Sequence, residues 1–121
     1  MGVFQIRNTV NEKVYVASSL NLPGSFNSGE FQLKMGIHPS KTLQSDWKLQ
    51  GGENFAFEVL EEVFPKEIDG YDYLADLLFL EDLWLEKLQP FGQNGYNEPK
   101  KTREERLLMI AENRSKTNLN L

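Results

Sequence analysis

The stretch GVFQIRNTVNEKVYVASS, residues 2–19, decides the fold. Its two ends, residues 2–8 and 13–19, are rich in the β-branched and aromatic side chains that favour strands. The short segment between them, Thr9 to Glu12, has the mostly polar composition of a turn. The stretch therefore predicts a tight antiparallel hairpin at the start of the chain.

The rest of the chain predicts helices and one more strand around this hairpin. Pro90 and Gly92 are expected to end the last helix. The expected fold class is α+β, with a small three-stranded antiparallel sheet flanked by helices. The expected elements after the hairpin are helices near residues 25–35 and 40–49, a strand at residues 55–62 and a long helix at residues 72–88.

Glu81 lies on the long helix in apolar surroundings. At helical spacing its neighbours one turn away are Leu77, Leu78, Trp84 and Leu85. Burial of a carboxylate there costs on the order of several kcal/mol unless the group finds a donor or a cation. Two interpretations stay open: a buried carboxylate within a hydrogen-bond network, and a metal ligand or general acid/base.

Several short motifs carry a family resemblance. Gly2-Val3-Phe4 and Tyr15-Val16-Ala17 on the hairpin, Glu81 on the long helix and Gly95-Tyr96-Asn97 after it occur in the order of the GIY-YIG endonuclease domain. Residues 1–97 are therefore expected to form one domain that resembles this family. The resemblance implies hydrolysis of DNA phosphodiesters with one divalent metal ion, Mg²⁺ or Mn²⁺. It further implies that Glu81 holds the metal.

Two departures from the family motifs fall on the chemistry that the resemblance implies. Phe4 occupies the place of the first motif tyrosine and has no hydroxyl to handle the attacking water. Ser25 occupies the place of an arginine and cannot reach or neutralise a phosphate. Ala17, in place of a glycine, is a milder change. The sequence thus leaves enzymatic activity open and favours its loss.

Four residues remain as candidates for a remnant catalytic site: Tyr15, His38, Glu81 and Asn97. Each also has an ordinary structural interpretation. Tyr15 suits the core of a sheet, His38 a surface loop, and Asn97 a turn that needs left-handed backbone. Glu81 alone rarely makes a tight magnesium site.

The composition and charge of the chain indicate which kind of partner it binds. The chain has 121 residues, no cysteine and a formal net charge of −5. Residues 1–97 carry seven basic and fourteen acidic residues, a net charge of −7, whereas residues 98–121 carry six basic and four acidic ones. An acidic surface repels DNA, so a protein partner is favoured and DNA is possible through the family resemblance alone. No membrane-spanning run is apparent, and a cytoplasmic location is expected.

The tail, residues 98–121, differs in character from the domain. Thr102 and Glu105 have capping-box spacing, and Leu107, Leu108 and Ala111 give the following short helix one apolar side. This helix is expected either to fold back onto the domain or to bind a partner.

Three functions follow from the sequence. The favoured one is a catalytically degenerate GIY-YIG nuclease-like protein, a pseudonuclease that acts as a binding or regulatory protein. The first alternative is a weak metal-dependent DNA endonuclease in which Lys13 or Lys34 replaces the missing arginine. The second is a non-catalytic DNA-binding module that uses the basic tail.

Overall fold

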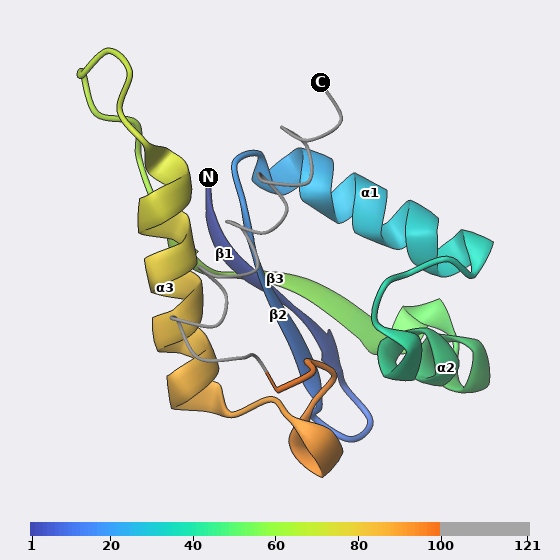
Figure 1. The fold of residues 1–121 in the computed structure, drawn as a ribbon. Coiled ribbons are helices and arrows are strands. Elements are labelled where there is room, and N and C mark those ends of the chain that lie inside the picture. Colours follow the sequence, from blue (N-terminus) through green and yellow to red (C-terminus); the bar gives the residue numbers. More distant parts are fainter. Residues whose placement is uncertain (100–121) are drawn as a thin grey trace, which may run out of the picture.

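A three-stranded antiparallel sheet lies between helices on its two faces (Figure 1). The computed structural model describes residues 1–99 of the chain. Within them the sheet has the order β2-β1-β3, and the expected α+β fold class is confirmed. The elements are β1 (Gly2–Asn8), β2 (Val14–Ser19), α1 (Leu22–Met35), α2 (Lys41–Gln50), β3 (Phe55–Glu62) and α3 (Tyr73–Leu88), with short 3₁₀ turns at Gly52–Asn54 and Gly92–Asn94.

The central strand β1 divides the core into two parts. Phe4 and Ile6 point toward α1 and α2 and pack with buried leucines of both helices. Val3 points to the other face and packs with Val16 of β2 and Leu85 of α3. Because successive side chains of a strand alternate between faces, β1 contributes to both parts of the core.

Helix ends follow local sequence, with one difference from the expected boundaries. α1 begins at Leu22 rather than near residue 25, because the side chain of Asn21 accepts a hydrogen bond from Gly24 N and Pro23 fits the first turn. It ends at Gly36, whose φ of 78° is left-handed. α3 begins after Asp72, whose carboxylate accepts from two backbone amides of the first turn.

The outer edge of β2 is covered by the segment that follows α3. Tyr96 N donates to Val14 O at 2.9 Å. The Asn97 side chain both accepts from Val16 N and donates to Val16 O, each at 2.8 Å. These bonds close an edge strand that would otherwise present unpaired backbone groups.

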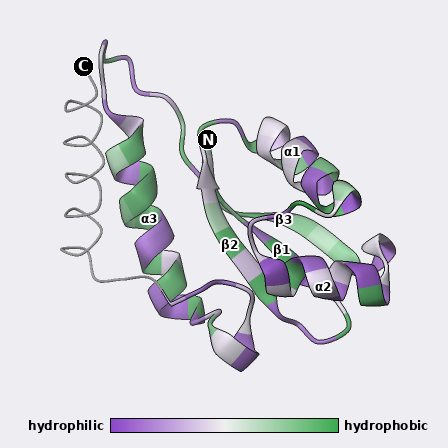
Figure 2. Cartoon of the chain, turned by 45° about the vertical axis from the view of Figure 1, so that its right-hand side comes forward, coloured by the Kyte–Doolittle hydropathy of each residue, from purple (hydrophilic) through white to green (hydrophobic). Residues whose placement is uncertain are grey.

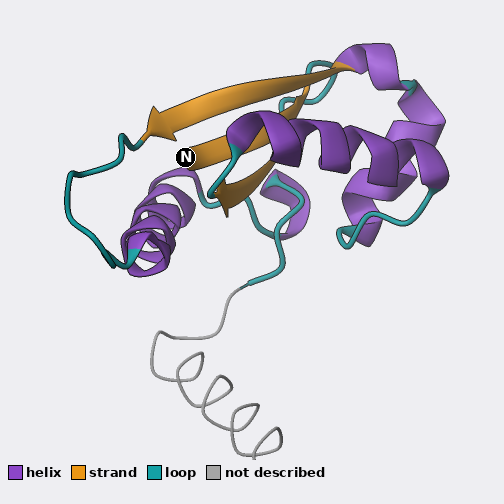
Figure 3. Cartoon of the chain, turned by 90° about the horizontal axis from the view of Figure 1, so that it is seen from above, coloured by secondary structure: helices purple, strands orange, loops and turns teal. Residues whose placement is uncertain are grey.

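The connection from β3 to α3 projects from the body of the molecule (Figures 1 and 3). Its own side chains hold it together: the rings of Tyr71 and Tyr73 contact each other at a tilt, with centroids 4.8 Å apart, and the Lys66 ammonium lies 4.5 Å from the centre of the Tyr71 ring. Among the described residues, no helix is long and apolar enough to cross a membrane. Most of the predicted tail and the short helix within it lie outside the described residues; only Glu98 and Pro99 fall within them.

Candidate functional site

A pocket of about 160 Å³ opens between the hairpin and α1. Phe4 of β1, Tyr15 of β2, Ser25 of α1 and His38 of the following loop all line it. The structure therefore brings together two residues of the predicted remnant site, Tyr15 and His38, and the two departures from the motifs, Phe4 and Ser25, from four different parts of the chain.

One side of α1 forms a wall of this pocket. Ser25, Ser28, Gly29 and Gln32 line it at the spacing i, i+3, i+4 and i+7. Sequence reasoning missed Ser28 and Gln32, and it also missed Ser18 of β2. The sequence does contain a signal for the two α1 residues, because their spacing from Ser25 places them on the same helix face. Ser18 directly follows the second motif.

The pocket wall contains no Asp, Glu, Lys or Arg among the described residues. The Ser25 hydroxyl is hydrogen-bonded to the Ser19 hydroxyl, at the start of the helix where the family carries a guanidinium. Phe4 presents an aromatic ring that packs edge-on against Phe26. These two positions thus add polarity or bulk to the pocket but no charge.

Tyr15 and His38 are the titratable side chains of the wall, and both favour their neutral forms. Burial, and secondarily the nearby Glu81, raise the pKa of the Tyr15 hydroxyl. Burial lowers the pKa of His38. The two rings meet edge to face, with centroids 5.0 Å apart.

The hydrogen bonds of His38 fix its tautomer. Ser40 N donates to His38 Nδ1 at 3.0 Å, so the proton of the neutral ring lies on Nε2. The one lone pair of the ring is therefore engaged, and His38 offers the pocket a donor rather than a base.

Glu81 lies behind the pocket wall and is only 7% exposed. Its Oε1 accepts from Ser18 N at 2.9 Å and from Ser18 Oγ at 3.3 Å. The structure thus supplies the hydrogen-bond network that the sequence left open as one interpretation. These bonds hold α3 against the edge strand β2.

The residues around Glu81 do not form a preassembled metal site. A divalent hard cation prefers several oxygen ligands, and residues 1–99 contain no group of three histidine, aspartate or glutamate side chains arranged for a metal ion. Glu81 is the one carboxylate that the motifs offer, and Ser18 already occupies its Oε1.

Asn97 does not line the pocket. Both polar groups of its side chain bind the Val16 backbone, which gives this residue a structural role at the sheet edge.

Lys13 and Lys34, the possible replacements for the arginine missing at position 25, also lie outside the pocket. Lys34 pairs with Glu30 at 3.0 Å, and the Lys13 ammonium lies 6.0 Å from the centre of the Tyr96 ring. Neither lines the pocket, so the expectation that one of them substitutes there finds no support in the geometry.

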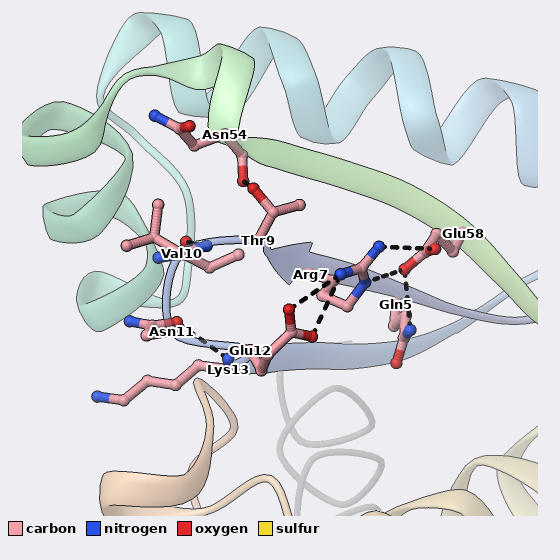
Figure 4. Close-up of polar contacts among 10 residues, drawn as sticks. Gln5, Arg7, Thr9, Val10, Asn11, Glu12, Lys13, Asn54 and Glu58 are labelled. Carbon is pink, nitrogen blue, oxygen red and sulfur yellow. Dashed lines mark hydrogen bonds and ion pairs between the residues drawn. The ribbon is translucent and has the colours of Figure 1, made fainter.

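Arg7, the one arginine among residues 1–99, is held by carboxylates (Figure 4). Its guanidinium bonds Glu58 at 2.7 Å and Glu12 at 3.2 Å. Because Arg7 follows Ile6 along β1, its side chain leaves the sheet on the face opposite to the pocket. It therefore ties the hairpin turn to β3 and does not serve the site.

Comparisons with known proteins show which proteins this chain is similar to. No protein-family model matches the chain. The chain is similar to Intron-associated endonuclease 1 of Enterobacteria phage T4, with 33% identity over 97 residues, 79% of this chain and 36% of that protein. It thus spans about a third of the length of this curated relative.

Two solved structures are also similar. The catalytic domain of homing endonuclease I-TevI has a TM-score of 0.67 and 29% identity, covering 82% of this chain and 98% of that one. A glutamate-to-alanine mutant of the same catalytic domain has a TM-score of 0.66 and 29% identity, covering 79% and 90%. Sequence and structure together therefore show that this chain carries a GIY-YIG-like domain, homologous to the I-TevI catalytic domain.

Proposed function

We propose that this chain is a catalytically degenerate nuclease-like protein that keeps the GIY-YIG scaffold and acts as a binding or regulatory protein. The observation that supports it is the chemistry of the pocket. Phosphodiester hydrolysis needs a group that activates water and positive charge that stabilises the transition state. Phe4 and Ser25 supply neither at the positions where the family motifs carry a tyrosine and an arginine.

The other groups of the pocket do not compensate for these losses. Tyr15 favours its protonated form, and the Nδ1 lone pair of His38 is engaged by Ser40. Among the described residues, no cation lines the wall. Loss of a positioned base and of a charge-stabilising donor each costs about 10²-fold or more in rate.

The retention of Glu81 and Asn97 does not require activity. Each accepts a hydrogen bond from an outward-facing amide of β2, so each stabilises the fold by itself. In an active protein the cofactor would be Mg²⁺ or Mn²⁺ held by Glu81, which would supply positive charge to the phosphate. The degenerate interpretation needs no cofactor.

A protein is the proposed partner because of charge. Residues 1–97 have a net charge of −7, and Arg7, the one arginine among residues 1–99, is already paired with Glu58. The competing proposal is a weak metal-dependent DNA endonuclease, which the similarity to endonucleases and the proximity of Tyr15 to Glu81 favour. A non-catalytic DNA-binding module that uses the basic tail is the remaining alternative.

Restoration of the two lost groups tests the proposal. The parent protein is expected not to nick supercoiled plasmid with Mg²⁺ or Mn²⁺. The double variant Phe4→Tyr/Ser25→Arg places a hydroxyl and a guanidinium at the pocket and is expected to gain metal-dependent nicking by about 10²-fold or more. Addition of Glu81→Gln to the double variant should remove this gain.

The matched control is Phe31→Tyr/Ser45→Arg. It makes the same chemical changes and adds the same charge at two exposed positions outside the pocket. It should remain inactive. Metal-dependent nicking by the parent protein that Glu81→Gln abolishes would instead establish the weak endonuclease, and a folded but inactive restored variant would refute the assignment of the loss to Phe4 and Ser25.

A further inference from the structure

The outer side of α3, away from the sheet, carries large apolar side chains. Leu78, Phe79 and Leu83 are between 42% and 52% exposed. Figure 2 shows that hydrophobic residues occur along much of this helix. Such a row on an amphipathic helix whose other side is already buried against β1 and β2 indicates that a further segment covers it.

The polarity of this side of α3 changes along the helix. Ala75, Leu78, Phe79, Asp82, Leu83 and Glu86 follow the spacing i, i+3, i+4, i+7, i+8 and i+11, and so form one stripe. The stripe is apolar toward the N-terminal end of α3 and acidic toward its C-terminal end. We call it the outer stripe of α3.

The tail, residues 100–121, has a complementary pattern in the opposite direction. Lys100, Lys101 and Arg103 come first, Glu104 and Glu105 come next, and the apolar side formed by Leu107, Leu108 and Ala111 follows. An antiparallel arrangement therefore brings Lys100, Lys101 and Arg103 nearest to the acidic end of the outer stripe and sets apolar residues against its apolar end.

The described chain ends in a place that allows this arrangement. Asn97 N donates to Pro90 O at 2.9 Å, and Pro90 lies two residues beyond the end of α3. From Lys101 to Leu108 a helix advances about 10 Å, and from Glu86 to Leu78 about 12 Å. The tail thus starts beside the acidic end and has the length to run back along the helix.

We propose that the segment of residues 102–111 docks as a helix, antiparallel, on the outer stripe of α3 of its own chain. Covalent attachment a few residues away gives the segment a high effective concentration at this face, which favours it over a separate partner. The proposal does not depend on whether the pocket is active.

A single spin label tests the docking. The chain has no cysteine, so Ser115→Cys gives one attachment site for a nitroxide, one turn beyond Ala111 on the same side. In the full chain we expect the label to broaden the amide resonances of Leu74, Leu78 and Phe79. Resonances of Phe31 and Met35 on α1 should keep their intensity.

Two double variants separate docking from accidental contact. Leu107→Glu/Leu108→Glu should abolish the broadening, whereas Met109→Glu/Asn113→Glu, with the same added charge on the other side of the expected helix, should preserve it. A label that broadens no α3 resonance would overturn the proposal. So would equal broadening of isotope-enriched chains without the label in a mixture with labelled, unenriched chains, since this would identify a second copy as the occupant.

Discussion

Glu81 contributes to stability through Ser18, whose backbone amide and hydroxyl both donate to its Oε1. Its apolar neighbours on the helix, taken alone, favour replacement by leucine, because a buried charge without a partner costs free energy. The hydrogen bond from the Ser18 amide leads to the opposite expectation. Removal of the acceptor leaves a poorly solvated N–H group without its partner.

We therefore expect Glu81→Leu to lower the free energy of unfolding by about 1–3 kcal/mol. Glu81→Gln should cost less, because its side-chain oxygen still accepts from the Ser18 amide. Urea unfolding followed by circular dichroism measures both. Glu86→Leu, at an exposed position of the same helix, is the control and should change stability by about 0.5 kcal/mol or less. A Glu81→Leu variant as stable as the parent would show that the Ser18 bond contributes nothing.

At the scale of elements, β2 is completed by residues far away in the sequence. Asn97, some 80 positions later, bonds both backbone groups of Val16 with one side-chain amide. This amide takes the place of a fourth strand along part of the edge.

Asn97→Ala should therefore lower the free energy of unfolding by about 1–3 kcal/mol, because the Val16 N–H and C=O lose their partners. Asn94→Ala is the control: it is an exposed asparagine of the same segment, and it should have little effect. Hydrogen exchange gives the sharper measurement, since the Val16 amide should exchange faster in Asn97→Ala while the amides of β3 keep their protection. Unchanged protection of Val16 would contradict the structural role.

The elements could be predicted from the sequence where local signals decide them. The hairpin and β3 lie where alternating β-branched and aromatic residues indicate them, and Pro90 follows closely on the end of α3. The sequence predicts the start of α1 three residues too late, because Asn21-Leu22-Pro23-Gly24 has the composition of a turn as well as of a capped helix start.

The site was predictable in part. Of the residues that the sequence singles out, Phe4, Tyr15, Ser25 and His38 line one pocket, whereas Glu81 and Asn97 do not line it. The engagement of Glu81 by Ser18 and of Asn97 by Val16 depends on how α3 and the last segment pack on β2. Such contacts between distant parts of the chain leave no periodic signal in the sequence.

At the scale of the whole molecule, charge opposes binding to a polyanion. Residues 1–97 carry a net charge of −7, and two of their seven basic side chains, Arg7 and Lys34, are in ion pairs with carboxylates. Basic residues instead gather in the tail after residue 99. We therefore expect contacts with phosphates to depend more on the tail than on the folded domain.

We expect the full chain to bind random duplex DNA more weakly than about 1 μM at physiological salt, because non-specific affinity comes mainly from lysine and arginine contacts with phosphates. Fluorescence anisotropy of a labelled duplex measures this over a range of salt concentrations. A chain that ends at Pro99 serves as the comparison and should bind no more tightly. Submicromolar affinity with a steep salt dependence, lost in the shortened chain, would show that the tail is a DNA-binding segment. In that case the tail could not also remain docked on the outer stripe of α3 through the same basic residues, and the spin-label broadening there should decrease as DNA is added.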